Sequence, residues 1–185
     1  MDVKSVDYDE KKDLFERFLT YRRRMARMCA VQAMYLFDIR QRVSNKKMTR
    51  QETQAEVTLV CKNVLYFYKN VFFSRQDYGQ NKKTRKIDEK YFLDTVLSAA
   101  KDIENIDKII AKHLNEKWTV SRLDTVVRSI LRCAVCEVLY ESKTEIAILT
   151  SEYTNIAAHF FNGKEIGFIN GIIDKIGKEK RKNES

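Results

Sequence analysis

The chain of 185 residues contains no proline and only five glycines, and this restricts its possible folds more than any other feature. Proline and glycine end helices and form the tight turns on which β-sheet proteins depend. Apolar residues also recur every three or four positions through most of the chain, which is the period of an amphipathic helix. We therefore expect an all-α fold, with about seven helices in a single compact bundle-like domain. The expected helices span residues 22–39, 52–73, 91–101, 103–114, 122–140, 146–161 and 165–178.

The chain divides by composition into a helical domain and two flanking segments. An N-terminal extension includes a short charged helix expected over residues 11–19. The domain itself carries a basic insertion around residues 74–88, which has the composition of a loop. The segment 122–140 is apolar almost all round, so we expect it to be the central helix. The expected boundaries are 1–21 for the extension, 22–178 for the domain and 179–185 for a charged C-terminal tail.

The charge balance points to polyanionic partners. Lysine and arginine number 35 against 26 acidic residues, which gives a formal net charge of +9. Such an excess favours association with nucleic acid or acidic surfaces and does not specify a fold. No apolar run reaches the roughly 18 residues of a membrane span, and the N-terminus has no apolar signal core. We expect a cytoplasmic protein that has no membrane partner and four reduced cysteines.

A cluster of arginines opens the first helix of the expected domain. At 100° per residue, Met25 and Cys29 fall on one side of this helix, together with Ala33 and Leu36. The same geometry places Arg23 and Arg27, and more marginally Arg24, on the opposite side. Arginine suits the binding of phosphate because its planar fork stays charged and donates hydrogen bonds in pairs. The segment therefore indicates a docking surface for a polyanion, and the alternative is an ordinary solvated polar face.

Several short motifs, taken in their order and spacing, resemble the NusB family over most of residues 22–176. The first is the arginine cluster followed by the sequence CAVQAMY at 29–35. The later pieces include RSILR at 128–132 and FINGIIDKI at 168–176. Further similarity lies at 114–118, 122–123 and 134–140.

The resemblance implies an all-helical RNA-binding protein of bacterial transcription antitermination. Members of the family bind boxA RNA together with NusE, a ribosomal small-subunit protein, within a complex of Nus factors and RNA polymerase. They support transcription of ribosomal RNA operons and need no cofactor. By this resemblance, Arg22, Arg23, Arg24 and Arg27 match the arginine-rich segment that contacts RNA.

The resemblance also assigns roles near the C-terminus and on the first helix. Phe168 opens the FINGIIDKI motif and is the expected contact for an RNA base, with ordinary core packing as the alternative. Lys164 and Lys175 flank the same helix and are expected to bind the RNA backbone, unless they are simply solvated. Tyr35 corresponds to a position on the side that faces NusE. Val127 stands where an acidic residue is common, so a contact with the partner is expected to be missing or replaced.

Catalysis and metal binding have little support in the sequence. The two histidines, His113 and His159, fall on different expected helices with no local nucleophile or metal motif. Cys133 and Cys136 have the spacing of half a zinc site, but no second ligand pair accompanies them. We expect these cysteines to fill space in a buried helix and Glu137 to pair with an arginine. Three glycines spaced every four residues, at 163, 167 and 171, indicate a close contact between helices.

Two other functions remain open from the sequence. The chain can be a protein-interaction or self-association module in which the Tyr35 surface pairs with itself and the basic face binds polyanions nonspecifically. A homodimer in the absence of NusE fits this alternative. The fold is also similar to the RNA-recruiting domain of ribosomal RNA methyltransferases, although residues 1–185 contain no cofactor domain.

Overall fold

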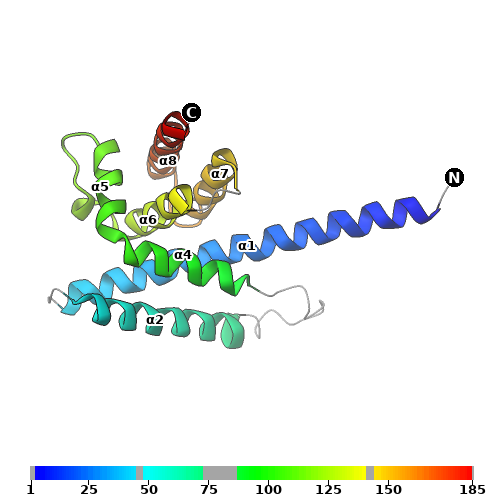
Figure 1. Ribbon diagram of the computed structural model, residues 1–185, viewed down its shortest axis with the longest axis horizontal. Coiled ribbons are helices and arrows are strands. Elements are labelled where there is room, and N and C mark those ends of the chain that lie inside the picture. The colour runs from blue at the N-terminus through cyan, green and yellow to red at the C-terminus, as the bar shows by residue number, and fades with distance from the viewer. Residues whose placement is uncertain (1–2, 45–47, 73–86, 141–143, 185) are drawn as a thin grey trace.

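The computed structural model describes residues 3–44, 48–72, 87–140 and 144–184, and within them every regular element is helical (Figure 1). This confirms the predicted all-α fold. A π-helical segment, Tyr68–Phe72, follows the second helix, and a short 3-10 helix, Val120–Arg122, precedes the sixth. The α-helices are α1 (Val3–Ser44), α2 (Arg50–Phe67), α4 (Glu89–Lys101), α5 (Ile103–His113), α6 (Thr125–Tyr140), α7 (Ile146–Ala157) and α8 (Lys164–Glu184).

Helix α6 is the centre of the bundle, as its apolar composition predicts. It packs against α1, α4, α5, α7 and α8. Every residue from 127 to 138 is buried, including Cys133 and Cys136. Because a helix enclosed on all sides has no solvent face, its polar residues must find partners inside the protein.

Helix α1 is much longer than predicted. The two helices expected over residues 11–19 and 22–39 are one continuous helix of 42 residues, about 63 Å long at 1.5 Å per residue. No proline or glycine interrupts the junction, and the hydroxyl of Thr20 donates to the carbonyl of Glu16 within the helix at 2.9 Å. The first turns of α1 extend away from the other helices, whereas the second half packs against α2, α4 and α6 (Figure 1).

The boundaries around α2 also differ from the predicted ones. The connection expected over residues 40–51 is shorter, because α1 continues to Ser44 and α2 begins at Arg50. Thr49 starts α2 with a capping box, in which its hydroxyl accepts from the amide of Glu52 and the Glu52 carboxylate accepts from the Thr49 amide. Residues 73–86, which contain most of the predicted basic insertion, lie outside the described residues.

Helices α7 and α8 form an antiparallel pair joined by the predicted turn at Asn162 and Gly163. Gly163 has a φ of +96°, a conformation that favours glycine. The close contact predicted at glycines 163, 167 and 171 is wrong, because a Cβ atom at any of them would meet nothing within 4 Å. The close approach lies instead at Gly177, where a Cβ would stand 2.2 Å from Cγ2 of Ile146.

The predicted C-terminal tail is helical as far as Glu184, since α8 continues through it. Lys180 anchors this part of α8 by donating from Nζ to the carbonyl of Val138 on α6 at 2.7 Å. None of the helices in the described part of the chain has both the length and the apolar content required to cross a membrane.

Candidate nucleic-acid interface

Arg27 belongs to the core, and the prediction that it projects from the outer side of the first helix is wrong. Its side chain is 4% exposed. Nε donates to Oε2 of Glu137 at 3.1 Å, and Nη2 donates to the hydroxyl of Tyr91 at 2.7 Å. The helical projection failed because α4, α6 and α7 all pack against α1 and leave this turn no open side. Burial opposes the charge of Arg27, yet Glu137, Tyr153 and Tyr91 outweigh it and raise its pKa above the ordinary value.

Glu137 joins three side chains in the centre of the bundle. Besides Arg27, it accepts hydrogen bonds from the hydroxyl of Tyr91 through Oε2 and from that of Tyr153 through Oε1, the latter at 2.5 Å. The predicted pairing of Glu137 with an arginine is confirmed. Burial, followed by the charge of Glu137, raises the pKa of Tyr153 well above its ordinary value. This buried set fixes the position of α1 against α4, α6 and α7.

Arg22 and Arg23 lie on α1 where it contacts the residues directly before α4. The guanidinium of Arg23 stands 4.8 Å from the centre of the Tyr91 ring, and its Nε lies 3.9 Å from Oδ2 of Asp88. Arg22 donates from Nη2 to the carbonyl of Ile87 at 3.5 Å. The Arg23 side chain remains 42% exposed, so its cation rests on an aromatic face with one side toward solvent.

Arg24 extends in the other direction, toward α7. Its Nε and Nη2 donate to the two carboxylate oxygens of Glu152, at 3.2 and 2.7 Å. Glu152 is only 9% exposed, whereas Arg24 is 49% exposed. The same carboxylate lies 3.6 Å from Nη1 of Arg27, so Glu152 stands between a buried and an exposed guanidinium.

The predicted α8 residues share one face of that helix. Lys164, Phe168 and Lys175 are separated by four and seven residues, which brings them within about 40° of one another around the axis. Both lysines are exposed, while Phe168 is half-buried and packs against the core. The structure does not bring these residues into contact with the arginines of α1. Helix α7 lies between the two groups: it packs extensively on α8 and pairs with Arg24 and Arg27 of α1 through Glu152.

Tyr35 lies on α1 eleven residues after Arg24, about 16 Å along the helix. Its side chain is 37% exposed, and that of the neighbouring Leu36 is 40% exposed. The helical projection predicts that Leu36 lies on the buried apolar side of the helix, and its exposure shows that this prediction is wrong. Val127, by contrast, is 4% exposed and faces the core.

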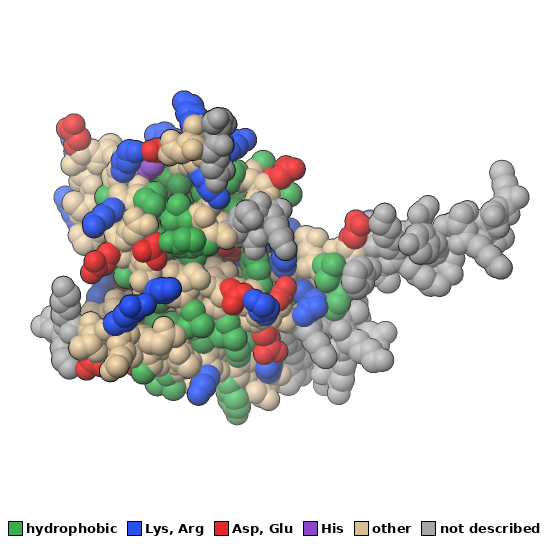
Figure 2. All heavy atoms as spheres, viewed as in Figure 1, with side chains coloured by type: hydrophobic (Ala, Val, Ile, Leu, Met, Phe, Trp, Pro, Cys, Tyr) green, Lys and Arg blue, Asp and Glu red, His purple; other side chains and the backbone are tan. Residues whose placement is uncertain are grey.

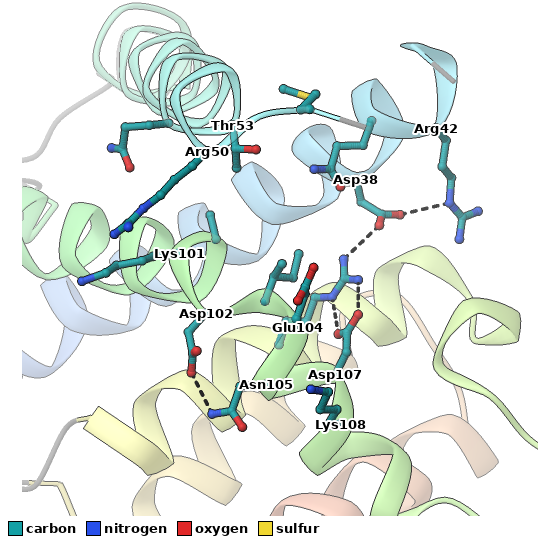
Figure 3. Close-up of a pocket in the computed structure, with 16 residues that line it drawn as sticks. Asp38, Arg42, Arg50, Thr53, Lys101, Asp102, Glu104, Asn105, Asp107 and Lys108 are labelled. Atoms are coloured by element: carbon teal, nitrogen blue, oxygen red, sulfur yellow. Dashed lines mark hydrogen bonds and ion pairs between the residues drawn. The ribbon is translucent and has the colours of Figure 1, made fainter. Parts of the chain in front are cut away.

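Sequence patterns gave no signal for Asp38, which neutralises the basic residues of α6. Its Oδ2 accepts from Nη2 of Arg128 at 2.5 Å, and its Oδ1 accepts from Nη1 of Arg132 at 2.9 Å. Arg132 also donates to both oxygens of Asp107, so a continuous network links α1, α5 and α6 (Figure 3). Arg128 and Arg132 are therefore structural cations rather than candidates for RNA contact.

A groove of about 770 Å³ adjoins this network, where the end of α1 and the start of α2 meet the junction of α4 and α5. Arg50 and Lys101 both extend along the same side of it, while Asp102 and Asn105 bond to each other (Figure 3). Both acidic and basic side chains line its wall. This groove lies at the opposite end of the packed part of α1 from the arginine cluster and is not part of the candidate interface.

The visible face of the molecule carries basic and acidic side chains interspersed with apolar ones (Figure 2). On this face the basic side chains therefore do not form one continuous patch. Within the described residues, no group of three or more His, Cys, Asp or Glu side chains is arranged to hold a metal ion. Cys133 and Cys136 are buried thiols, and burial raises the pKa of Cys136 to about 12.

Comparison with known proteins agrees with the fold. The profile of the NusB family matches residues 24–178. The chain is 31% identical over 163 residues to transcription antitermination protein NusB of Bartonella quintana, which covers 88% of this chain and 92% of the relative. It is 32% identical over 155 residues to the protein of the same name from Rickettsia massiliae, and the alignment covers 84% of this chain and 90% of that relative.

Two solved structures show the same arrangement of helices. NusB from T. maritima matches with a TM-score of 0.59 and 24% identity, over 88% of this chain and 96% of that one. The second structure is a complex of the antitermination factors NusB and NusE with dsRNA. It matches with a TM-score of 0.61 and 25% identity, over 84% of this chain and 96% of that chain.

Proposed function

Because the chain belongs to the NusB family, we propose that it is a transcription antitermination factor that binds boxA-like single-stranded RNA together with NusE. The relatives named above are antitermination proteins, and one structural neighbour was solved with NusE and RNA. The protein acts in the bacterial cytoplasm with other Nus factors and RNA polymerase on ribosomal RNA operons. It works by binding alone, without catalysis or a cofactor.

The observation that carries the RNA-binding proposal is the geometry of Arg23 and Arg24. Both guanidiniums are partly exposed, and each is held by a fixed group, the ring of Tyr91 or the carboxylate of Glu152. A held arginine loses less conformational entropy when it binds a phosphate. Arg22 borders this pair, whereas Arg27 supports it from the core through Tyr91.

The helix α8 supplies the second part of the proposed RNA contact. Phe168 keeps part of its ring accessible for stacking on a splayed base, which is the usual way that proteins recognise single-stranded RNA. Lys164 and Lys175, on the same face, bind the backbone on either side of it. Tyr35 lies further along α1 and contributes to the surface for NusE.

The placement of RNA on the arginine cluster is tested with the double variant Arg23→Ala/Arg24→Ala. Binding of a labelled boxA strand is followed by fluorescence anisotropy at several salt concentrations. We expect weaker binding and a salt slope that is lower by about one to two. Unchanged affinity and slope would place the RNA elsewhere. Lys62→Ala/Lys69→Ala, which removes two exposed cations from α2 and the π-helical segment after it, is the matched control.

A self-association module is the second candidate function, because Tyr35 and Leu36 present adjacent apolar side chains to solvent on α1. In that case the same surface pairs with a second copy. Light scattering with and without NusE separates the two functions. The antitermination proposal predicts a one-to-one complex with NusE that is lost in Tyr35→Asp, whereas the alternative predicts a dimer that NusE leaves unchanged.

A further inference from the structure

The contact between Arg24 and Glu152 joins the arginine cluster to α7, across 128 positions of sequence. Arginine has five N–H donors. Glu152 accepts from Nε and Nη2, which leaves the donors of Nη1 and the outer donor of Nη2. Those donors form a second edge of the guanidinium, and within the described residues Arg24 has no other hydrogen-bonded acceptor. One edge is therefore fixed to the protein while the other is available to a ligand.

The carboxylate itself is held in place from the inside. Glu152 is 9% exposed and lies 3.6 Å from Nη1 of Arg27, which Glu137 and Tyr91 hold in the core. A chain of contacts thus runs from the centre of the bundle through Arg27 and Glu152 to the exposed Arg24. Such support is what keeps a binding group in one orientation before the ligand arrives.

We propose that Glu152 is a positioning residue for RNA, which fixes the guanidinium of Arg24 so that its second edge faces a phosphate. This inference rests on the proposed function. The carboxylate does not touch RNA; it acts through Arg24. Glu152 also brings α7 into register with α1, and α7 leads directly into the turn before Lys164 and Phe168.

Electrostatics and positioning make opposite predictions for one substitution. Glu152→Gln keeps the length of the side chain but removes a negative charge, so Coulomb attraction alone would tighten the binding of any polyanion. Positioning predicts weaker binding in spite of this gain in positive charge. Glu152→Asp keeps the charge but shortens the reach by one methylene, and positioning predicts weaker binding here as well.

The test measures boxA binding by fluorescence anisotropy over a range of salt concentrations, with stability checked for each variant by urea unfolding. We expect Glu152→Gln and Glu152→Asp to bind at least about threefold more weakly, with a salt slope lower by up to about one. Glu104→Gln is the matched control, because it makes the same change of charge at an exposed site on α5.

A double-mutant cycle separates positioning from general structural damage. In an Arg24→Ala background, Glu152→Gln should cause no further loss of RNA affinity, since the side chain that it positions is already gone. Tighter binding by Glu152→Gln, or an equal loss in both backgrounds, would overturn the proposal. If Arg23→Ala/Arg24→Ala itself leaves RNA binding unchanged, the RNA binds elsewhere, and both the placement on the arginines and the positioning role of Glu152 fail. If only the Glu152 variants bind RNA as the wild type does, the positioning role alone fails. The proposed function itself fails if the wild type shows no preference for boxA RNA.

Discussion

Nε of Arg27 lies 3.1 Å from Oε2 of Glu137 in a pair that joins α1 to α6 across 110 positions of sequence. The side chains are 4% and 2% exposed, so this ion pair is almost completely shielded from water. A run of arginines that appears uniform in the sequence is therefore divided by the fold. Arg27 stabilises the bundle, and Arg23 and Arg24 remain at the surface.

Arg27→Ala should lower the free energy of unfolding by about 3–5 kcal/mol, because it leaves the Glu137 carboxylate buried without its cation. Urea unfolding followed by circular dichroism measures the loss. The control is Arg23→Ala, whose side chain is 42% exposed and whose loss should cost no more than about 1 kcal/mol. Equal effects of the two substitutions would contradict the division between core and surface arginines.

Asp38 should make the stability depend on pH under acidic conditions. Burial opposes its ionisation, but the guanidiniums of Arg128 and Arg132 outweigh burial and hold the pKa of Asp38 below its ordinary value of 3.8. The unfolded chain therefore binds the proton more readily, and stability falls as the pH drops below about 4 and through the folded pKa. Asp38→Asn should be less stable near neutral pH and should lose less additional stability over that acidic range.

Urea unfolding at a series of pH values tests this expectation for the wild type and for Asp38→Asn. An acid loss in the variant that equals or exceeds that of the wild type would show that Asp38 does not carry the linkage.

The elements that periodicity dictates were predictable from the sequence. The ranges expected for α4 and α5 agree closely with the structure, and α6 is the central helix, because apolar spacing reports directly on burial. The boundaries of α1 were not predictable in the same way. Helix continuation through residue 21 depends on the absence of any local breaker, and the pattern changes at this junction, where the mainly apolar side chains of residues 18–21 are followed at once by three arginines.

The candidate site was only partly predictable, because its geometry depends on contacts distant in sequence. The helical projection treats α1 as an isolated helix with one buried side, whereas α4, α6 and α7 surround the turn that contains Arg27. Tyr91, Glu152 and Asp38 carry no motif of their own, and only the fold brings them to the arginines. Pairing with arginine was predictable for Glu137, since a carboxylate inside an apolar helix requires a cation.

The glycines of α8 provide a matched pair of substitutions. Gly177→Ala should destabilise the protein by about 1–3 kcal/mol, because its Cβ would overlap the branched side chain of Ile146 on α7. Gly171→Ala adds a methyl group where nothing lies within 4 Å, and it should raise stability by about 0.4–1 kcal/mol through helix propensity. Thermal unfolding of both variants checks the packing of α7 on α8, and a Gly177→Ala variant as stable as the wild type would contradict it.

Phe168→Ala should weaken the binding of boxA RNA by about 1–3 kcal/mol if the ring stacks on a base. Some stability will also be lost, since Phe168 packs partly against the core, so binding is measured well below the unfolding temperature. Tyr66→Ala is the control, because Tyr66 is a 67% exposed aromatic residue on α2. If both variants bind RNA as the wild type does, Phe168 is a packing residue only.

The most direct test of the proposed function is the binding of two labelled RNA strands of equal length, one with a boxA sequence and one scrambled, measured by fluorescence anisotropy at two salt concentrations with and without NusE. The account predicts a preference for the boxA strand that increases when NusE is added and persists at the higher salt concentration. Equal, salt-sensitive binding of both strands that NusE does not change would contradict it.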